Sequence, residues 1–338
     1  MHRVESFFHQ LPRLRLLVVG DLMLDRYLWG RATRLSPEAP VPVVEVTRES
    51  ALAGGAANVA TNAAAMGAQV HLLGVIGADE AGLELQNALQ RYAVSGDHLL
   101  RVPDRPTIQK TRVMASNQQL LRVDHEDLSP VPAWVEETVL SQVERLLPNV
   151  DAIILSDYRK GLLSGSLPPL IIQLAQTAGV PVITDSKARH YAPFQGSIIT
   201  PNRFEAEAAT GCVLQDPPSL ARAGALLREQ TGGEVPVLIT LGGDGMALFD
   251  GADRPQVIPA INSSVYDVTG AGDTVVGTLA LAVAAGWPIR ESAILANYAA
   301  AVVVREAGTA VCTPEKLRAM IEESRYVWDV YVTTYGRD

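Results

Sequence analysis

The chain has only two cysteines in 338 residues, Cys212 and Cys312. Two isolated cysteines exclude a disulfide framework and a Cys-x-x-Cys metal site. Cysteine-poor chains are typical of reducing compartments, so we expect a cytoplasmic location. Arg3, Glu5 and His9 interrupt any apolar run at the N-terminus, which excludes a signal peptide there. Residues 1–13 are interpreted as a short polar lead-in.

Positive charge is also scarce: the chain has 28 Lys and Arg residues against 37 Asp and Glu residues, which gives a net charge of −9. A nucleic-acid-binding protein needs a basic footprint, so that class is excluded. A phosphorylated small substrate is not excluded, because one local basic pocket is enough to bind it. No apolar run reaches membrane-spanning length without charge or Pro. We therefore expect small-molecule ligands and neither a nucleic acid nor a membrane as partner.

Two phosphate-binding signatures are missing. Gly-x-x-x-x-Gly-Lys-Ser/Thr occurs nowhere, so a Walker-type loop is excluded. Gly270 and Gly272 match the first two glycines of a dinucleotide fingerprint, but Val275 stands at the third. That motif also lies late in the chain, whereas a dinucleotide-binding fold would open with it. An oxidoreductase is therefore disfavoured.

The most informative stretch that is present runs from Val265 to Gly277. Gly270, Ala271 and Gly272 directly precede a helical pattern, and glycine lets backbone N–H groups approach a ligand closely. The helix start adds unpaired donors and the positive end of its dipole, which together predict an anion site. Asp273 in the first turn could accept the proton of an attacking hydroxyl, so the pattern suits phosphoryl transfer.

The same stretch also has plainer interpretations. A glycine-rich turn is often only a tight connection, and an Asp in a first helical turn is often only favourable dipole electrostatics. If Asp273 does act as a base, the helix start is expected to lower its pKa and make it a weak one. A weak base is tolerable, because a loose transition state keeps the proton on the nucleophile until late.

The rest of the chain alternates strands and helices, which predicts an α/β fold with a mostly parallel sheet covered on both faces. The predicted strands are 14–20, 70–75, 152–155, 182–185, 198–200, 237–240 and 246–249. Polar clusters follow several of them: Asp21 and Asp25, Ser156–Gly161, Asn202 with Glu205, and Thr240–Gly245. Each alone could be a cap or a turn. Together, at the carboxyl ends of parallel strands, they favour a nucleotide-phosphate site.

Two blocks break this rhythm, at about 26–48 and 103–125. Val41–Val46 alternates among prolines, which predicts an edge strand, and 107–124 reads as a hairpin turning at Asn117. If the hairpin pairs with Val41–Val46, the blocks form one small sheet, a lid over the site. The lid would carry Lys110, Arg112 and Arg122, although a solvated strand face is the commoner use of such cations. Its apolar alternation predicts a homodimer clasped lid to lid.

With these residues laid out, the chain resembles the ribokinase-like (PfkB) carbohydrate kinases over about residues 14–320. The motifs that carry the resemblance are Gly54-Gly55-Ala56-Ala57-Asn58 and Asp267–Asp273. The resemblance implies a three-layer α/β/α sandwich with a β-lid, ATP as donor and Mg²⁺ as cofactor, with K⁺ as a further candidate. Asp273 would be the base, and the N–H groups of Gly270, Ala271 and Gly272 would stabilise the transferred phosphoryl.

The resemblance also assigns binding residues. Asn202 and Glu205 would organise Mg²⁺ indirectly, and Asp267 and Thr269 would hold a monovalent cation. The nucleotide would lie against Thr240, Gly242, Gly243, Gly245 and Asn297. Substrate contacts are expected from Asp21, Asp25, Arg34, Gly54, Gly55, Asn58, Lys110, Arg112, Arg122, Asp157 and Lys187.

Within the family, Val18–Tyr27, Leu35–Val43 and Asn117–Arg122 are similar to bacterial D-glycero-β-D-manno-heptose 7-phosphate kinases. This implies phosphorylation of the anomeric hydroxyl, with the cations Lys110, Arg112, Arg122, Lys160 and Lys187 as candidates for the 7-phosphate. Among them we expect Lys187 and at least one lid cation to bind it. Arg159 and the Thr184–Ala188 segment depart from the subfamily pattern, so another sugar remains open: fructose phosphate, ribose or a nucleoside. A catalytically inactive sugar-binding regulator is the alternative from another class.

His-x-Gly-His is absent, so we expect one kinase domain over 1–338 without a fused nucleotidylyltransferase.

Overall fold

The computed structural model describes residues 2–115, 118–251, 255–261, 266–306 and 310–335. Within them, nine strands form one sheet in the order β13-β12-β11-β10-β9-β8-β1-β4-β5. All neighbours pair in parallel from β5 to β11, and β12 and β13 add antiparallel. Their bounds are β1 Arg15–Gly20, β4 Gln69–Gly77, β5 Leu99–Val102, β8 Ala152–Asp157, β9 Val182–Ser186, β10 Ile198–Ile199, β11 Val237–Thr240, β12 Met246–Phe249 and β13 Gln256–Ile258.

Helices cover both faces of this sheet, because alternate strand residues point to opposite sides. Leu16 and Val18 of β1 belong to one buried cluster, and Leu17 and Val19 to the other. The first face is covered by α1 His2–Gln10, α2 Ala56–Ala65, α3 Glu80–Gln90, α8 Ala271–Ala284, α9 Ile289–Val303, α10 Pro314–Glu323 and α11 Arg325–Tyr335. The second is covered by α4 Ala133–Leu146, α5 Leu167–Ala178, α6 Arg203–Thr210 and α7 Pro217–Gln230. The predicted three-layer α/β/α class is confirmed.

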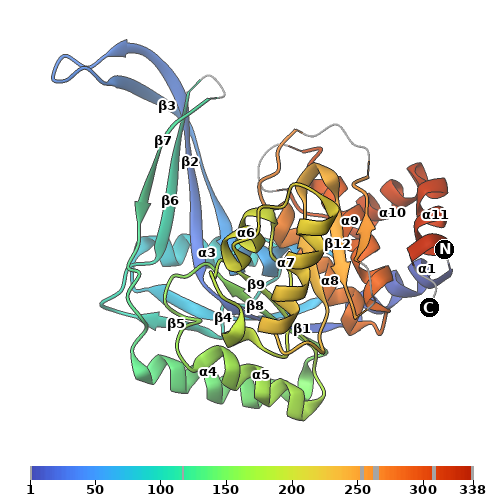
Figure 1. Ribbon diagram of the computed structural model, residues 1–338. Helices are drawn as coiled ribbons and strands as arrows, with labels where there is room; N and C mark the ends of the chain where they lie inside the picture. Colours follow the sequence, from blue (N-terminus) through green and yellow to red (C-terminus); the bar gives the residue numbers. More distant parts are fainter. Residues whose placement is uncertain (1, 116–117, 252–254, 262–265, 307–309, 336–338) are drawn as a thin grey trace.

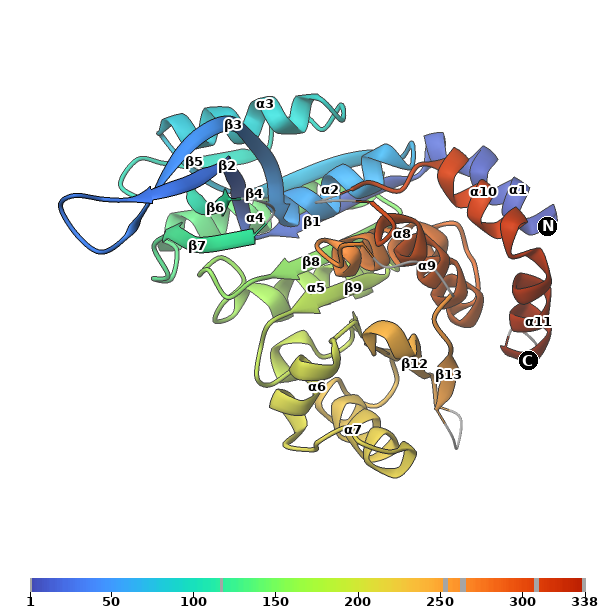
Figure 2. The same cartoon turned by 90° about the horizontal axis from the view of Figure 1, so that it is seen from above.

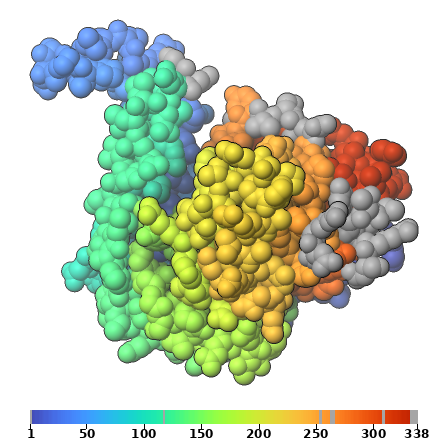
Figure 3. Space-filling view, in the orientation of Figure 1, coloured from blue at the N-terminus to red at the C-terminus, as the bar shows by residue number. Residues whose placement is uncertain are grey.

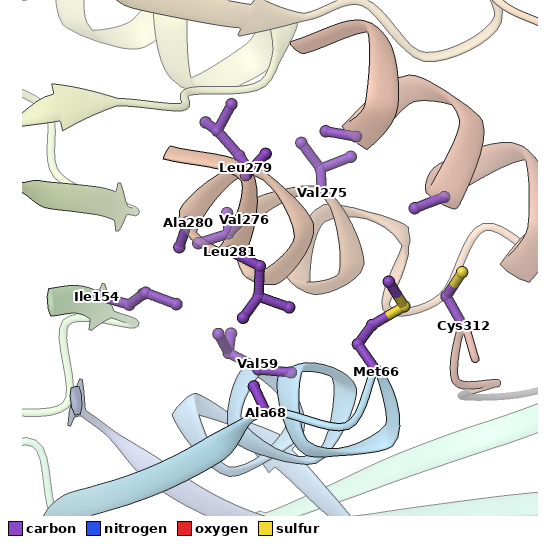
Figure 4. Close-up of a cluster of buried hydrophobic side chains, with 14 of the residues drawn as sticks. Val59, Met66, Ala68, Ile154, Val275, Val276, Leu279, Ala280, Leu281 and Cys312 are labelled. Atoms are coloured by element: carbon purple, nitrogen blue, oxygen red, sulfur yellow. The ribbon is translucent and has the colours of Figure 1, made fainter. Parts of the chain in front are cut away.

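Helix α8 lies at the centre of the first core. Its residues are buried from Asp273 to Ala282, and Figure 4 shows Val276 and Leu281 lying among side chains of α2 and β8. Gly277 faces α2 closely: a Cβ there would lie 3.6 Å from the carbonyl of Val59. This packing fixes the N-terminal turn of α8, and with it Asp273, relative to the sheet.

A second sheet of four strands, β3-β2-β6-β7, forms the predicted lid and rises from one end of the body (Figure 1). Its strands are β2 Leu22–Leu35, β3 Pro42–Gly55, β6 Ile108–Ala115 and β7 Gln118–His125. The far part of the β2–β3 ribbon stands clear of the rest of the molecule (Figures 2 and 3). It leaves Leu35 66%, Val41 51% and Val46 42% exposed.

The lid differs from the prediction in its pairing and its bounds. The hairpin does not pair with Val41–Val46, because β2 lies between them and pairs in parallel with β6. The lid also begins earlier than predicted, at Leu22, and β3 continues to Gly55, at the start of α2. The edge position expected for the proline-flanked strand β3 is confirmed. The predicted turn at Asn117 lies outside the described residues.

The interpretation of residues 1–13 as a polar lead-in was wrong. Residues His2–Gln10 form helix α1, and Val4, Phe7 and Phe8 are buried. Their i, i+3, i+4 spacing is the helical signal that the charged neighbours concealed. The Phe7 ring packs edge-on against Trp287 with the ring centroids 5.4 Å apart. At the other end of the chain, Trp328 of α11 packs against Tyr298.

Candidate active site

The candidate site lies where the parallel strands end. Tyr158 follows β8, Lys187 follows β9 and Asn202 follows β10, while Thr240 ends β11. The N-terminus of α8 and the first turn of α2 reach the same edge, since Asn58 contacts Asp273. The sequence-based expectation that these polar clusters converge is therefore borne out by the geometry.

Asp273 is buried and holds two side-chain hydrogen bonds. The Tyr158 hydroxyl donates to Oδ1 at 2.7 Å, and the Asn58 amide donates to Oδ2 at 2.5 Å. Burial raises the pKa of Asp273, and these two donors together with Lys187 only partly offset that effect. The expectation of a lowered pKa was wrong, because desolvation outweighs the helix start here. A raised pKa makes Asp273 a stronger base than expected.

The turn before α8 has the geometry of an anion site. Gly270 has φ of 77°, the left-handed conformation that glycine adopts without strain. The N–H of Ala271 donates to the carbonyl of Val268 at 3.2 Å, so it is already used. The N–H groups of Gly272 and Asp273 lie in the first turn, where a helix supplies no acceptor. The donors best placed for a phosphoryl group are therefore the N–H groups of Gly272 and Asp273, and not the expected set of Gly270, Ala271 and Gly272.

Lys187 lies between two carboxylates and beside the candidate base. Its Nζ is 2.7 Å from Glu205 Oε1 and 3.4 Å from Asp185 Oδ1. It also lies over the Tyr158 ring, 5.2 Å from the centroid. Burial alone would lower the pKa of Lys187, but the two carboxylates together raise it, so the side chain is a cation. Burial raises the pKa of Asp185 to about 7 even though the nearby Lys187 lowers it.

A cavity of about 260 Å³ lies next to this cluster, between β11, β12 and helices α8 and α9. All five predicted nucleotide residues line it, with Ala271 and Gly272 at the α8 end: Thr240, Gly242, Gly243, Gly245 and Asn297. The remaining wall is largely apolar, as a planar base requires: Met246, Ala260, Ile261, Val268, Val275, Ala300, Ala301 and Val304. Asn297 donates to the carbonyl of Pro259 at 2.7 Å and so fixes this wall.

Asn202 and Glu205 form a capping box at the start of α6, where each side chain accepts from the other's backbone N–H. Glu205 also faces Lys187, which places a carboxylate beside the anion site. Mg²⁺ in kinases is held by one or two carboxylates, phosphates and water, so these residues fit an ion that arrives with the nucleotide. No group of three or more His, Cys, Asp or Glu among the described residues could hold a metal without such help.

The predicted monovalent-cation residues lie just before α8. Asp267 Oδ1 accepts the N–H of Thr269 at 2.9 Å, and the backbone N–H of Asp267 donates to the carbonyl of Val304 at 3.2 Å. The first bond stabilises the turn itself, and the second holds it against the end of α9. The role in cation binding stays a prediction.

One face of the lid carries three cationic side chains, and its Asp25 lies close enough to Asp273 to raise the pKa of that carboxyl. Asp25, Lys110, Arg112 and Arg122 share this face, because Asp25 pairs with Lys110 and Arg112 with Arg122 across the strands. Acids neutralise most of this charge: Arg112 bonds Asp25 at 2.5 Å, and Arg122 bonds Asp124 at 2.7 Å. Lys110 lies 3.4 Å from Asp124. A bound anion would therefore compete with these carboxylates.

Two predicted substrate residues, Arg34 and Asp157, lie elsewhere. Arg34 is exposed on the projecting part of the β2–β3 ribbon, where it pairs with Val43, and the structure does not bring it to Asp273. Asp157 accepts from the Ser186 hydroxyl at 2.5 Å, and it lines a separate cavity with Arg159 and Arg189.

Asp21 is buried, and its carboxylate is a hydrogen-bond acceptor for backbone N–H groups. Its carboxylate accepts the N–H groups of Tyr158 and Lys160, both at 2.9 Å. Gly55 lies beside it at the lid base, where a Cβ would be 2.5 Å from the Asp21 carbonyl, and Gly54 lies against the Asp25 carboxylate. Asp21 and the two glycines shape the site rather than present a free side chain to it.

Sequence reasoning missed Tyr158, although it stands in a cluster that was singled out. A tyrosine after a strand is most often a packing residue, and nothing in its spacing indicates that its hydroxyl reaches Asp273. Asn62 was also missed: it accepts from Thr274 at 2.7 Å and extends the polar contact between α2 and α8. Its position one helical turn after Asn58 is the signal that could have found it.

Comparison with known proteins decides the family. The pfkB family carbohydrate kinase profile matches residues 13–316. The chain belongs to this family. A pfkB kinase transfers a phosphoryl group to a sugar hydroxyl, so the chain is a phosphotransferase. The chain is 43% identical over 319 residues to bifunctional protein HldE of Trichlorobacter lovleyi and 45% identical over 313 residues to that of Wolinella succinogenes.

These alignments cover 94% and 92% of this pfkB chain but only 65% of each relative's own length. Among solved structures, Arabidopsis thaliana ribokinase with ribose and ATP has a TM-score of 0.74 at 23% identity, covering 91% of this chain and 99% of that one. Escherichia coli phosphofructokinase-2, in its tetrameric inhibited form, has a TM-score of 0.75 at 18% identity, covering 93% and 99%. These two likenesses support the ribokinase-like fold. No described helix could span a membrane.

Proposed function

We propose that the chain is an ATP-dependent kinase that phosphorylates the anomeric hydroxyl of D-glycero-β-D-manno-heptose 7-phosphate to the 1,7-bisphosphate. The observation that carries the proposal is the lid face on which Asp25 and Arg122, from segments that resemble heptose 7-phosphate kinases, lie beside Lys110 and Arg112. The HldE relatives support the same substrate. The proposed place of the enzyme is in ADP-heptose synthesis for lipopolysaccharide or another glycan, in the cytoplasm.

In this mechanism Asp273 accepts the proton of the anomeric hydroxyl, which is more acidic than an ordinary alcohol. The first-turn N–H groups of Gly272 and Asp273 bind the oxygens of the transferred phosphoryl. Lys187 adds a positive charge beside them, so we assign it to the transferred phosphoryl rather than to the 7-phosphate. Mg²⁺, held through Glu205 and Asn202, would neutralise phosphate charge when bound. The cavity along α9 accepts the adenine of ATP.

The lid face is the proposed binding site of the 7-phosphate. Arg122→Glu is expected to raise KM for the phosphorylated sugar about 10- to 100-fold, because hydrogen bonds between charged groups contribute about 1.5–3 kcal/mol. The kcat value should change little, since Arg122 lies on the lid and not among the groups around Asp273. Initial rates against sugar concentration at saturating MgATP measure both values. Arg222→Glu, on the exposed surface of α7, makes the same charge change away from the site. An equal KM for the two variants would remove Arg122 from the site.

The lid is also the proposed dimer interface. The β2–β3 ribbon exposes Leu35, Val41 and Val46, and β7 exposes Leu121 and Val123. Exposed apolar strands are covered by pairing with another copy in many proteins, so we expect a homodimer clasped through this sheet. Light scattering at micromolar concentration should give twice the chain mass, and Val46→Arg should shift it toward the monomer. A wild-type monomer would contradict the proposal.

The substrate is tested directly by following ADP release with three sugars: the heptose 7-phosphate, fructose 6-phosphate and ribose. We expect turnover with the heptose and at most slow turnover with the others. Activity confined to fructose 6-phosphate or ribose would show that the substitutions at Arg159 and Ser186 changed the specificity. An inactive regulator would bind a sugar and release no ADP with any of them.

A further inference from the structure

We propose that Tyr158 is a positioning residue for phosphoryl transfer: its hydroxyl orients the carboxylate of Asp273 toward the sugar hydroxyl. The inference rests on the proposed role of Asp273 as base and adds a residue that the family motifs do not contain. Its ground is geometric, since the Tyr158 hydroxyl lies 2.7 Å from Asp273 Oδ1 and donates to it.

Two donors fix the plane of the carboxylate. Asn58 from α2 occupies Oδ2 at 2.5 Å, and Tyr158 from the β8 end occupies Oδ1. A carboxylate held at both oxygens cannot rotate, so its remaining lone pairs keep one direction. A base works only when it lies within hydrogen-bond reach of the proton that it takes, so this fixed direction bears on the rate.

Tyr158 is itself held in place from behind. Its backbone N–H donates to the buried carboxylate of Asp21 at 2.9 Å. The next residue, Arg159, has φ of 56°, an unusual conformation for a non-glycine residue. The Arg159 N–H donates to Asp157 Oδ1 at 2.8 Å, which helps to stabilise that turn. Buried Asp21 and the strained turn together aim the Tyr158 ring at Asp273.

The surroundings keep the hydroxyl protonated. Burial raises the pKa of Tyr158 well above its ordinary value, and the negative charge of Asp273 raises it further. Tyr158 is therefore a hydrogen-bond donor throughout the neutral range and does not compete for the sugar's proton. The ammonium of Lys187 lies over the Tyr158 ring, so a positive charge stands next to the proposed position of the transferred phosphoryl group.

The test compares Tyr158→Phe with the wild type, using whichever sugar the wild-type enzyme turns over. Phenylalanine keeps the ring and loses only the hydroxyl, so folding should be preserved. We expect kcat to fall about 10- to 100-fold, the factor for one hydrogen bond to a charged group, with little change in either KM. Tyr298→Phe is the matched control, because it removes a buried hydroxyl bonded to the Ser324 carbonyl.

The pH profile separates positioning from packing. The Tyr158 hydrogen bond lowers the pKa of Asp273, so its loss should raise that pKa and move the acid-side fall of kcat to higher pH. The other charged groups that face Asp273 are Lys187, Asp25 and Asp185, and the variant leaves all three in place. An unchanged kcat and an unchanged acid limb in Tyr158→Phe would overturn the inference. If Asp273→Asn keeps full turnover, the base assignment itself fails, whatever Tyr158→Phe does.

Discussion

Asp273→Asn is expected to lower kcat by about 10²- to 10⁴-fold, the usual contribution of a general base. The amide cannot accept the sugar's proton but keeps the size of the side chain. Its oxygen still accepts from Asn58, and its NH2 group donates to the Tyr158 oxygen once that hydroxyl rotates. Sugar and nucleotide binding should therefore remain close to wild type. Rapid-quench turnover, combined with calorimetric titration of each ligand, separates the two effects. Loss of binding in parallel with turnover would mean that Asp273 serves mainly to build the site.

The same variant should not be less stable at neutral pH. Burial raises the pKa of Asp273 in the folded protein, so folding favours its protonated form. Stability is then lost as pH rises from the ordinary carboxyl pKa through the raised one, and the ionised group costs stability above it. A neutral Asn removes that cost. We expect the Tm of Asp273→Asn at pH 7–8 to equal or exceed that of the wild type.

Lys187→Met is expected to lower kcat about 10²- to 10³-fold, the cost of removing one fixed group that stabilises transition-state charge. The ammonium lies between Glu205 and Asp185 and near Asp273, at the anion site rather than on the lid. KM for the sugar should change less than kcat. Steady-state kinetics in both substrates would show this split.

Two further variants sharpen the test of Lys187. Lys187→Arg keeps the charge and should recover part of the rate. Asp185→Asn leaves the Lys187–Glu205 pair and should cost less than Lys187→Met. A sharp rise in KM for phosphorylated sugars alone, with kcat preserved, would instead place Lys187 at the 7-phosphate.

Much of the fold could be predicted from local pattern. The strand β1 and the helix that follows Gly270 are continuous apolar runs bounded by Gly or polar residues, which sequence periodicity identifies well. The pairing of the lid could not be predicted in this way. Neither β2 nor β6 carries a local signal that sets them side by side, and their parallel pairing depends on contacts between segments far apart in the chain.

In the candidate site, too, features that depend on residue type and spacing could be predicted, and features that depend on tertiary contacts could not. Glycines and acids in motifs were found because their type and spacing carry chemistry, as at Gly270 and Asp273. The pKa of Asp273 and the use of Tyr158 could not be found, since both depend on burial and on partners from α2 and β8. Asp21 illustrates the reverse case: its type and place suggested a ligand contact, but its carboxylate is used by backbone N–H groups.

The central claim is the transfer of a phosphoryl group to the anomeric hydroxyl of a heptose 7-phosphate. Phosphorus NMR of the enzyme with MgATP and D-glycero-D-manno-heptose 7-phosphate tests it most directly. The account predicts a new anomeric phosphate signal that grows with ADP, beside the unchanged 7-phosphate signal, and no such signal with Asp273→Asn. A heptose spectrum that stays unchanged, while fructose 6-phosphate or ribose gives a new phosphate signal, would contradict it.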